Sequence, residues 1–153
     1  MYYFLDYDEP LFRPPSEAGS LNNKGVRVEV NAQDAPAITG HPNAFSQVLL
    51  NIVNNAIDAF VETRCADPCL TVNLRTENGK AVVAIADNAG GIDEQIIGRI
   101  FEPYFTTKEQ GKGTGIGLFM AKSIIEKSMG GRLAVRNVDG GVEFRIEVQG
   151  KSG

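Results

Sequence analysis

The sequence predicts an α+β fold in which helices pack on one face of a mixed sheet. Segments that alternate apolar and polar residues, the period of a strand, lie near both ends of the chain and in its middle. Two longer segments between them repeat apolar residues at every third or fourth position, which is the period of a helix with one buried side. An Asn-Gly pair at 78 and 79, between two apolar runs, is typical of a hairpin.

The first strand and the first helix follow an irregular start. Residues 1–25 contain three prolines and no sustained period, and we interpret them as a connector from an upstream region. A strand is expected at 25–30 and a second, short one at 37–40. The helical period then begins, and a long helix is expected at 42–63, with Pro42 suited to its first position.

The second half of the chain is expected to complete the sheet and to add a second long helix. In chain order its elements are an antiparallel hairpin of 70–76 and 81–86, a short helix at 92–101, a polar loop at 102–114, a helix at 115–129, and two strands at 133–136 and 142–148 around a turn at 137–141. We expect one domain at 26–149 and a tail at 150–153. The other face of the sheet is then either solvated or covered by another domain.

Composition and charge narrow the functional classes. The chain has 153 residues, 42% hydrophobic and 22% charged, which is typical of one globular domain. Its net charge of −4 has the wrong sign for binding a nucleic-acid backbone. The longest uninterrupted apolar run, 81–86, is too short to span a bilayer, and the chain does not start with a basic segment before an apolar one. We expect a cytoplasmic domain without nucleic-acid or membrane contact, in a parent protein that could be membrane-anchored.

The two cysteines, Cys65 and Cys69, are separated by three residues. A lone pair without another Cys or His nearby is a weak signal for a metal. We interpret them as reduced thiols in a reducing cytosol.

Amide and acidic side chains line one side of the predicted helix 42–63. They are Gln47, Asn51, Asn54, Asn55, Asp58 and Glu62. A solvated face usually carries Glu, Lys, Arg and Gln, because Asn is a poorer helix former by several tenths of a kcal/mol. Asn51 and Asn55, one turn apart, would point two neutral oxygens the same way, which suits Mg²⁺ already balanced by phosphate. A plain solvated face and a cation site both remain open.

Three further segments have a pattern that suits a ligand and also an ordinary explanation. Asp87 ends an apolar strand before two glycines, where a carboxylate can accept a hydrogen bond from an amino group or simply belong to a turn. The glycines of 111–118 precede a helix, where they suit a phosphate site or a flexible hinge, although the spacing is not that of a P-loop. The aromatic residues of 100–108 before Lys108 either dock a partner group or belong to the core.

The order of these four motifs is that of the N box, first glycine box, F box and second glycine box of sensor histidine kinases. Over about residues 26–149 the chain therefore resembles the ATP-binding catalytic domain of that family, within the GHKL superfamily. The resemblance implies the Bergerat fold, a two-layer sandwich with a mixed, mostly antiparallel sheet. The strings Asn-Asn-Ala-Ile-Asp-Ala at 54–59 and Phe-Glu-Pro-Tyr-Phe-Thr-Thr-Lys at 101–108 are similar to the nitrogen-regulation and dicarboxylate-sensing branch.

The resemblance implies ATP and Mg²⁺ as cofactors and gives site residues their roles. Asn55 would bind Mg²⁺, Asn51 would lie beside the triphosphate, Asp87 would accept the adenine amino group, and Gly91 would let the base approach. Asn51, Asn55 and Lys108 are expected to be catalytic. The full set expected at the nucleotide is Asn51, Asn55, Asp58, Asp87, Ala89, Gly91, Ile92, Phe101, Phe105, Thr106, Lys108, Gly113, Thr114, Gly115, Ile116, Gly117 and Leu118.

Three positions depart from the commonest family pattern. Ala89 replaces the first glycine of the box, so that turn must be one that L-residues adopt. Asp58 stands where other branches have a phosphate-contacting lysine, and Thr106 where many have an arginine. Lys108, and less surely Lys112, would then supply the positive charge.

The family transfers the γ-phosphoryl group of ATP to a histidine in a separate dimerisation domain, which passes it to a response regulator. His41 is the only histidine and lies in Gly-His-Pro-Asn, so we expect the acceptor histidine outside this chain. An anti-sigma-type serine kinase is disfavoured by the F box. A gyrase-type ATPase is disfavoured by Asn51, because those enzymes have a water-activating glutamate there. A nucleotide-sensing module without phosphotransfer stays open.

Overall fold

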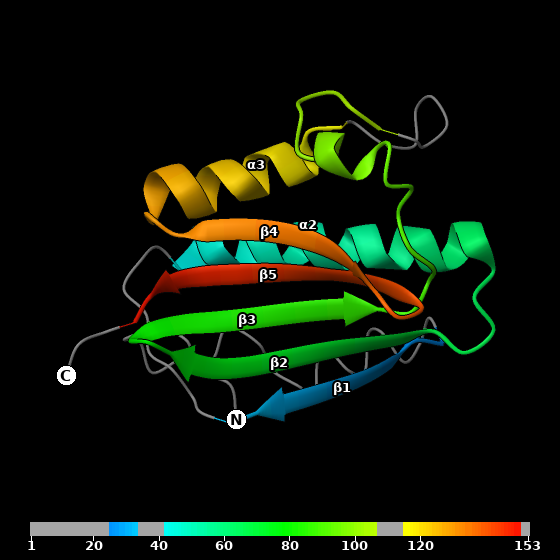
Figure 1. The fold of residues 1–153 in the computed structure, drawn as a ribbon, viewed down its shortest axis with the longest axis horizontal. Helices are drawn as coiled ribbons and strands as arrows, with labels where there is room; N and C mark the ends of the chain where they lie inside the picture. Colours follow the sequence, from blue (N-terminus) through cyan, green and yellow to red (C-terminus); the bar gives the residue numbers. More distant parts are fainter. Residues whose placement is uncertain (1–24, 34–41, 107–114, 151–153) are drawn as a thin grey trace.

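The structure, a computed structural model, describes residues 25–33, 42–106 and 115–150. In this part of the chain one sheet has the strand order β1-β2-β3-β5-β4; in the view of Figure 1, helix α2 lies behind the sheet and α3 lies above its β4 edge. The elements are β1 (Arg27–Ala32), α2 (Pro42–Thr63), β2 (Cys69–Glu77), β3 (Lys80–Asp87), the 3₁₀ turn η1 (Ile97–Arg99), α3 (Gly117–Ser123), the π-helical turn η2 (Ile124–Ser128), β4 (Arg132–Val138) and β5 (Gly141–Gln149). The predicted α+β class with helices on one face is confirmed.

The sheet is mixed and mostly antiparallel, as predicted. β1 pairs with β2 in parallel, with Arg27 opposite Cys69, whereas the pairs β2–β3, β3–β5 and β4–β5 are antiparallel. Asn78 and Gly79 both have positive φ angles, 52° and 77°, between the paired residues Glu77 and Lys80. These angles are those of a two-residue hairpin turn, which the Asn-Gly pair predicts.

Helix α2 has the predicted bounds and carries one side of the core. Its apolar side chains, spaced at three and four, are buried against the inner face of the sheet. They are Phe45, Val48, Leu49, Ile52, Val53, Ala56 and Phe60. The facing positions of the strands are the alternate residues of β2, β3 and β5, such as Leu74, Val83 and Phe144. Burial of this stripe is the main driving force for packing the helix onto the sheet.

By length and composition alone, Asn43–Thr63 of α2 is also long and apolar enough to cross a membrane. It is the one helix among the described residues with this length and composition, which the core helix of a globular domain can also have. Since the apolar side of α2 lies against the sheet, its hydrophobicity is accounted for by this core.

Helix α3 begins two residues later than predicted. Gly115 has φ 69°, outside the helical region, so the regular turns start at Gly117. The helical segment then continues through the π-helical turn η2 to Ser128, and Gly130, with φ 64°, follows its end. Ala121 and Ile125 are fully buried, which fixes the side of this segment that faces the core.

Two local predictions are wrong, and a third concerns residues that the structure does not describe. The helix expected at 92–101 is reduced to the single turn Ile97–Arg99, because the preceding residues form a loop with bonds to distant parts of the chain. The last turn is shorter than expected: β4 runs to Val138 and β5 starts at Gly141. The strand expected at 37–40 lies outside the described residues.

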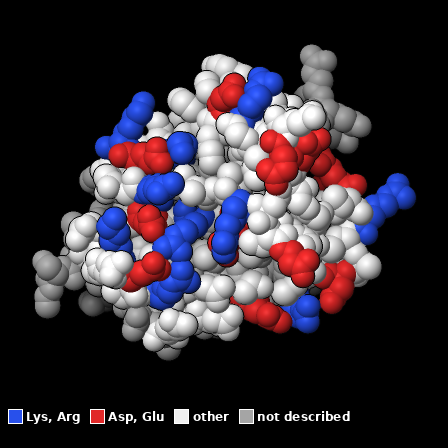
Figure 2. All heavy atoms as spheres, in the orientation of Figure 1, with Lys and Arg blue, Asp and Glu red and all other residues white. Residues whose placement is uncertain are grey.

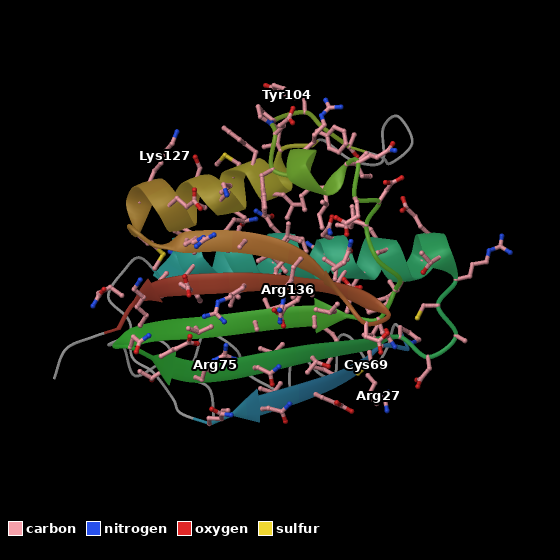
Figure 3. The ribbon with its side chains drawn as sticks, in the orientation of Figure 1. Arg27, Cys69, Arg75, Tyr104, Lys127 and Arg136 are labelled. Atoms are coloured by element: carbon pink, nitrogen blue, oxygen red, sulfur yellow. The ribbon has the colours of Figure 1, made fainter. Side chains whose placement is uncertain are left out.

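The outer face of the sheet carries ion pairs between side chains of its strands. Arg145 pairs with Glu77 at 3.1 Å and with Glu147 at 2.9 Å, and Arg136 pairs with Glu143 at 2.8 Å. Figure 2 shows these basic and acidic groups interleaved over the face turned to the viewer, and Figure 3 labels Arg136 among them. The described part of this face is therefore charged, and its coverage by another domain stays a prediction.

Candidate functional site

A pocket of about 460 Å³ lies where α2, the C-terminal end of β3, the following loop and the start of α3 meet. It brings together residues from all four sequence motifs. The predicted residues that line it are Asn51, Asn55, Asp58, Asp87, Ala89, Gly91, Ile92, Phe105, Thr106, Gly115, Gly117 and Leu118. Its lining combines apolar side chains with amides and carboxylates, a combination typical of a small-molecule site.

Asp87 is the buried acid of the pocket. Only 9% of its surface is exposed, because it is the last residue of β3 and lies beside the start of β5. Burial raises the pKa of its carboxyl group, and hydrogen bonds from the backbone of Ala89 and Val142 only partly oppose this shift. A carboxylate held in this way is a directed acceptor for a ligand that offers N–H groups.

The turn after Asp87 is held by contacts with the β4–β5 hairpin. Gly90 donates a backbone hydrogen bond to the carbonyl oxygen of Gly140 at 3.0 Å. Gly141 has no room for a side chain, since a Cβ atom there would overlap the carbonyl oxygen of Asp87. The carboxylate therefore sits at a junction of three strands, β3, β5 and β4, and its position depends on their register.

Asn88 connects the same turn to the loop that precedes β2. Its side chain accepts a hydrogen bond from the backbone of Cys69 at 2.8 Å and donates one to the carbonyl oxygen of Asp67 at 2.9 Å. Cys65 and Cys69 are free thiols, as expected, and Cys65 points its sulfur at the Asn88 carbonyl oxygen at 3.5 Å. The Cys65 thiol and the Cys69 backbone thus support the turn next to the pocket.

Asn51 uses both polar atoms of its side chain within the protein. Its amide nitrogen donates to the carbonyl oxygen of Gly117 at 3.0 Å, and its oxygen accepts from Gln47 at 3.0 Å. Gly117 approaches closely, since a Cβ atom there would lie 3.7 Å from Asn51 Cγ. Asn51 therefore ties the glycine-rich start of α3 to α2, a contact that links the first and last motifs.

Asn55 differs from Asn51 although both lie in the pocket. Its side chain makes no hydrogen bond to any described residue, so its carbonyl oxygen is available to a ligand. Asp58 lies one turn further along the same wall. An amide oxygen at the start of this wall and a carboxylate after it offer the oxygen ligands that Mg²⁺ prefers.

The aromatic motif divides between the core and the pocket. Phe101 packs edge-on against Phe144, with 6.2 Å between ring centroids, and is not among the residues that line the pocket. Phe105 lines the pocket, with the guanidinium group of Arg99 4.6 Å from its ring centroid. The two sequence-based interpretations of the motif therefore each apply to one phenylalanine.

The two sides of segment 107–114 are held next to each other. Tyr104 donates a backbone hydrogen bond to the carbonyl oxygen of Gly115 at 2.8 Å, and a Cβ atom on Gly115 would lie 2.5 Å from the Tyr104 carbonyl carbon. The Tyr104 side chain itself points outward and is 78% exposed, as Figure 3 shows. Lys108, Lys112, Gly113 and Thr114, together with His41, lie outside the described residues. Ile116 precedes α3 and does not line the pocket.

Part of the lining lies outside the set expected at the nucleotide. Asn54 and Glu62 belong to the predicted polar side of the helix 42–63 but are not in that set. The residues that sequence reasoning missed are Ala59, Thr63, Gly90, Asp93, Ile96, Ile100 and Val142. Ala59 and Thr63 follow Asn55 at four-residue spacing, so the helical period alone could have found them. Val142 is placed there only by its pairing with Asp87.

The donor set fits Mg²⁺ as a partner of phosphate and does not fit a metal held by protein alone. Within residues 25–33, 42–106 and 115–150 no group of three or more His, Cys, Asp or Glu side chains is placed to hold a metal ion. Mg²⁺ usually takes one or two protein ligands and completes its shell with phosphate oxygens and water. Asn55 is an amide of the pocket that makes no hydrogen bond to a described residue and could serve as such a ligand.

Residues 40–152 match the family of histidine kinase-, DNA gyrase B- and HSP90-like ATPases. This chain belongs to that family. Membership in this ATPase family implies that the domain binds ATP, and it confirms the resemblance drawn from the four motifs. The chain is 34% identical to the two-component sensor PprA of Pseudomonas aeruginosa over 141 residues. This alignment covers 84% of this chain and 15% of PprA. It is 32% identical over 127 residues to sporulation kinase A of Bacillus subtilis, covering 83% of this chain and 20% of that protein.

Solved histidine kinase structures have the same fold. The catalytic domain of histidine kinase ThkA superposes with a TM-score of 0.77 and 26% identity, covering 89% of this chain and 86% of that domain. Full-length ShkA in complex with AMPPNP gives 0.75 and 25% identity over 94% of this chain and 30% of ShkA. ThkA in complex with the response regulator TrrA gives 0.70 at 22% identity, covering 91% of this chain and 38% of that chain, which is a likeness of fold. The chain spans 15% of PprA and 20% of sporulation kinase A.

Proposed function

We propose that this chain is the ATP-binding catalytic domain of a sensor histidine kinase. In this proposal it binds Mg-ATP and transfers the γ-phosphoryl group to a histidine on a separate dimerisation domain. The observation that carries the proposal is that a buried carboxylate, Asp87, and a free amide, Asn55, line one pocket with the glycine-rich start of α3. The first suits the amino group of a purine and the second suits a phosphate-bound cation.

The base would enter at the end of β3. Asp87 would accept a hydrogen bond from the adenine amino group, and Ile92, Ile96 and Ile100 would pack against the flat faces of the ring. The complex of ShkA with AMPPNP, an ATP analogue in a related fold, supports a nucleotide in this type of domain.

The phosphates would lie between α2 and the start of α3. Asn55 would hold Mg²⁺, which when bound offsets the phosphate charge and fixes the phosphate geometry. Gly115 and Gly117 line the same pocket, and their backbone N–H groups would suit phosphate oxygens. Lys108 stays a proposed source of positive charge.

Phosphotransfer is favoured over hydrolysis by the chemistry of Asn51. An amide has no basic group to activate water, and both polar atoms of Asn51 are already engaged with Gln47 and Gly117. The chain would therefore align ATP for attack by an incoming imidazole without supplying a base for water. The anti-sigma-type kinase and the gyrase-type ATPase are not favoured by the relatives, which are sensors and kinases.

The partners follow from this function. The dimerisation domain would supply the acceptor histidine and would pass the phosphoryl group to a response regulator. ThkA, whose catalytic domain shares this fold, occurs in complex with the response regulator TrrA. We propose a cytoplasmic location for the domain, without membrane contact, and also without nucleic-acid contact because the net charge is −4.

Calorimetric titration of ATP and ADP into the wild type and Asp87→Asn tests the nucleotide site. We expect the substitution to weaken both nucleotides roughly 10- to 100-fold, because a hydrogen bond to a charged acceptor is lost. Asp67→Asn is the matched control, since Asp67 is an exposed aspartate that pairs with Arg27. Phosphorylation of a purified histidine-bearing dimerisation domain, supplied in trans with labelled ATP, then tests the kinase activity. A wild type that binds no ATP would refute the proposal.

The affinity for ATP is expected to fall on acidification at a higher pH than for an ordinary aspartate. The pKa of Asp87 is raised by burial from 3.8, so protonation, which weakens the acceptor, begins earlier. The Kd for ATP is measured at a series of pH values for both proteins, and the Kd of Asp87→Asn is divided by that of the wild type. Protonation of the ATP phosphates affects both Kd values equally, so it cancels in this ratio. This ratio should approach one as the pH falls through the raised pKa of Asp87 toward 3.8. A ratio independent of pH would contradict the role of Asp87.

The same shift predicts the opposite trend for stability. Between 3.8 and the raised pKa, the folded protein binds more protons at Asp87 than the unfolded chain does, so stability decreases as the pH rises through this window. Above the raised pKa, the buried carboxylate lowers the free energy of unfolding by an amount that no longer changes with pH. Asp87→Asn should therefore unfold at a higher temperature than the wild type at neutral pH, even though it binds ATP less tightly. Thermal melts of both proteins at acidic and neutral pH would show this.

A further inference from the structure

The loop between β3 and the 3₁₀ turn η1 forms one wall of the pocket without helix or strand structure of its own. Ala89, Gly91, Ile92 and Ile96 all line the pocket from this loop. A ligand can be recognised there only if the loop backbone is held in one position, because an unpaired loop would have to be ordered at the moment of binding. The bonds that hold it therefore matter for the site.

One side chain outside the pocket lining supplies three of these bonds. The Asn137 oxygen accepts a hydrogen bond from the Ile92 backbone nitrogen at 2.7 Å, and its amide nitrogen donates to the Ile92 carbonyl oxygen at 2.8 Å. The same nitrogen also donates to Glu94 Oε1 at 2.8 Å. Both backbone groups of one loop residue are thus held by a single amide from β4.

The position of Asn137 follows from the strand period. Leu133 and Val135 of β4 face the helices, with Leu133 in the core and Val135 packed against it. Asn137, two residues further along, lies on the same face at the end of the strand. Its partner across the ladder is Val142, which in turn pairs with Asp87. In Figure 1 the tip of the β4–β5 hairpin and the end of β3 lie at the same end of the sheet.

Gly91 leaves the space that this side chain occupies. A Cβ atom on Gly91 would lie 2.9 Å from Asn137 Oδ1 and 3.2 Å from its Cγ atom, closer than real Cβ contacts normally are. The neighbouring Gly90 shows the contrast, because a Cβ atom there would meet nothing within 4 Å. The crowding at position 91 therefore comes from Asn137, on the protein side of the loop.

We propose that Asn137 is a positioning residue for the nucleotide site and that position 91 is glycine in order to admit the Asn137 amide. The inference deepens the proposed function and rests on it for the ligand, ATP. Asn137 does not touch the nucleotide; it fixes the wall made by Gly91 and Ile92, next to the acceptor Asp87. In this arrangement the β4–β5 hairpin controls the shape of the base subsite.

A double-mutant cycle tests both halves of the proposal. ATP affinity is measured for Gly91→Ala, Asn137→Ala and the double variant. We expect each single change to weaken ATP roughly tenfold, in the range seen when a supporting side chain is lost, and the double variant to be no weaker than the worse single one. If Gly91→Ala weakened ATP equally with and without Asn137, position 91 would face the base, and the second half would be overturned.

The hydrogen bonds between the Asn137 side chain and the Ile92 backbone form a clamp on the loop. Hydrogen exchange in the nucleotide-free protein tests this clamp without relying on ATP. The Ile92 amide should exchange at least about tenfold faster in Asn137→Ala, while the Val83 amide in β3, which reports opening of the sheet, keeps its rate. Asn73→Ala is the matched control, because Asn73 is an amide on the outer face that accepts a bond from Asn31. Unchanged exchange at Ile92 in Asn137→Ala would overturn the proposal. If the wild type bound no ATP, the proposed function would fail while this result still decided the clamp.

Discussion

Gly141→Ala is expected to lower the free energy of unfolding by about 3 kcal/mol, at the upper end of the cost of overpacking. The added Cβ atom would overlap the carbonyl oxygen of Asp87, a main-chain atom at the end of the central strand β3 that cannot rotate away. Relief requires β5 to move away from β3 where Asp87 and Val142 pair. For a domain of this size the melting temperature should fall by roughly 6–12 °C.

Two other glycines, Gly140 and Gly98, separate crowding from backbone strain. Gly140→Ala adds its Cβ atom in open space but must keep φ 75°, so about 1 kcal/mol of strain is expected. Gly98→Ala meets nothing within 4 Å, and its φ angle is not in the left-handed region, so it should be neutral or slightly stabilising. Chemical denaturation of the three variants gives the comparison. A cost at Gly141 no larger than at Gly140 would show that contact with Asp87 is not the cause.

Asn55→Ala is expected to remove the Mg²⁺ dependence of ATP binding and to lower phosphotransfer in trans by about a hundredfold or more, because the proposed metal ligand is lost. The fold should not suffer. Asn55 makes no hydrogen bond to a described residue, and alanine is the better helix former, so stability should rise by a few tenths of a kcal/mol.

Asn51→Ala is the informative comparison on the same wall. It deletes the bonds to Gln47 and Gly117, so it should lower stability by about 1–2 kcal/mol as well as affect the site. Calorimetry with and without Mg²⁺, combined with melting curves, distinguishes the two variants. Mg²⁺ dependence that survives in Asn55→Ala would move the metal ligand to another residue of the pocket.

Local patterns were sufficient to predict several elements. Helix α2 has the predicted bounds because its apolar period depends only on neighbours three and four residues away, and the same period places Asn51, Asn55 and Asp58 together. The β2–β3 hairpin follows from the positive φ angles that Asn78 and Gly79 tolerate. The motif order also predicted the family to which the chain belongs.

The failure at 92–101 shows where local patterns are insufficient. Ile92, Ile96 and Ile100 have helical spacing, yet all three line the pocket, and only Ile97–Arg99 form a turn of 3₁₀ helix. The carbonyl oxygen of Ile92, which would pair within a helix, accepts from Asn137, 45 residues away, and the Ile92 N–H donates to the same side chain. A long-range hydrogen-bond partner has replaced the local one, and no local pattern indicates it.

The sequence by itself determined which chemical groups the site contains: the amides of α2, the carboxylate after β3 and the glycines before α3. Only the tertiary structure decided how each group is used. Asn51 and Asn55 are the same residue type one turn apart, but only Asn51 faces Gly117 and is engaged there. Asn137 appears in the sequence as an ordinary turn residue and becomes the clamp of the pocket wall because β4 lies beside β5. Such roles depend on contacts between distant segments, which are set by strand order and core packing, and not by neighbouring residues.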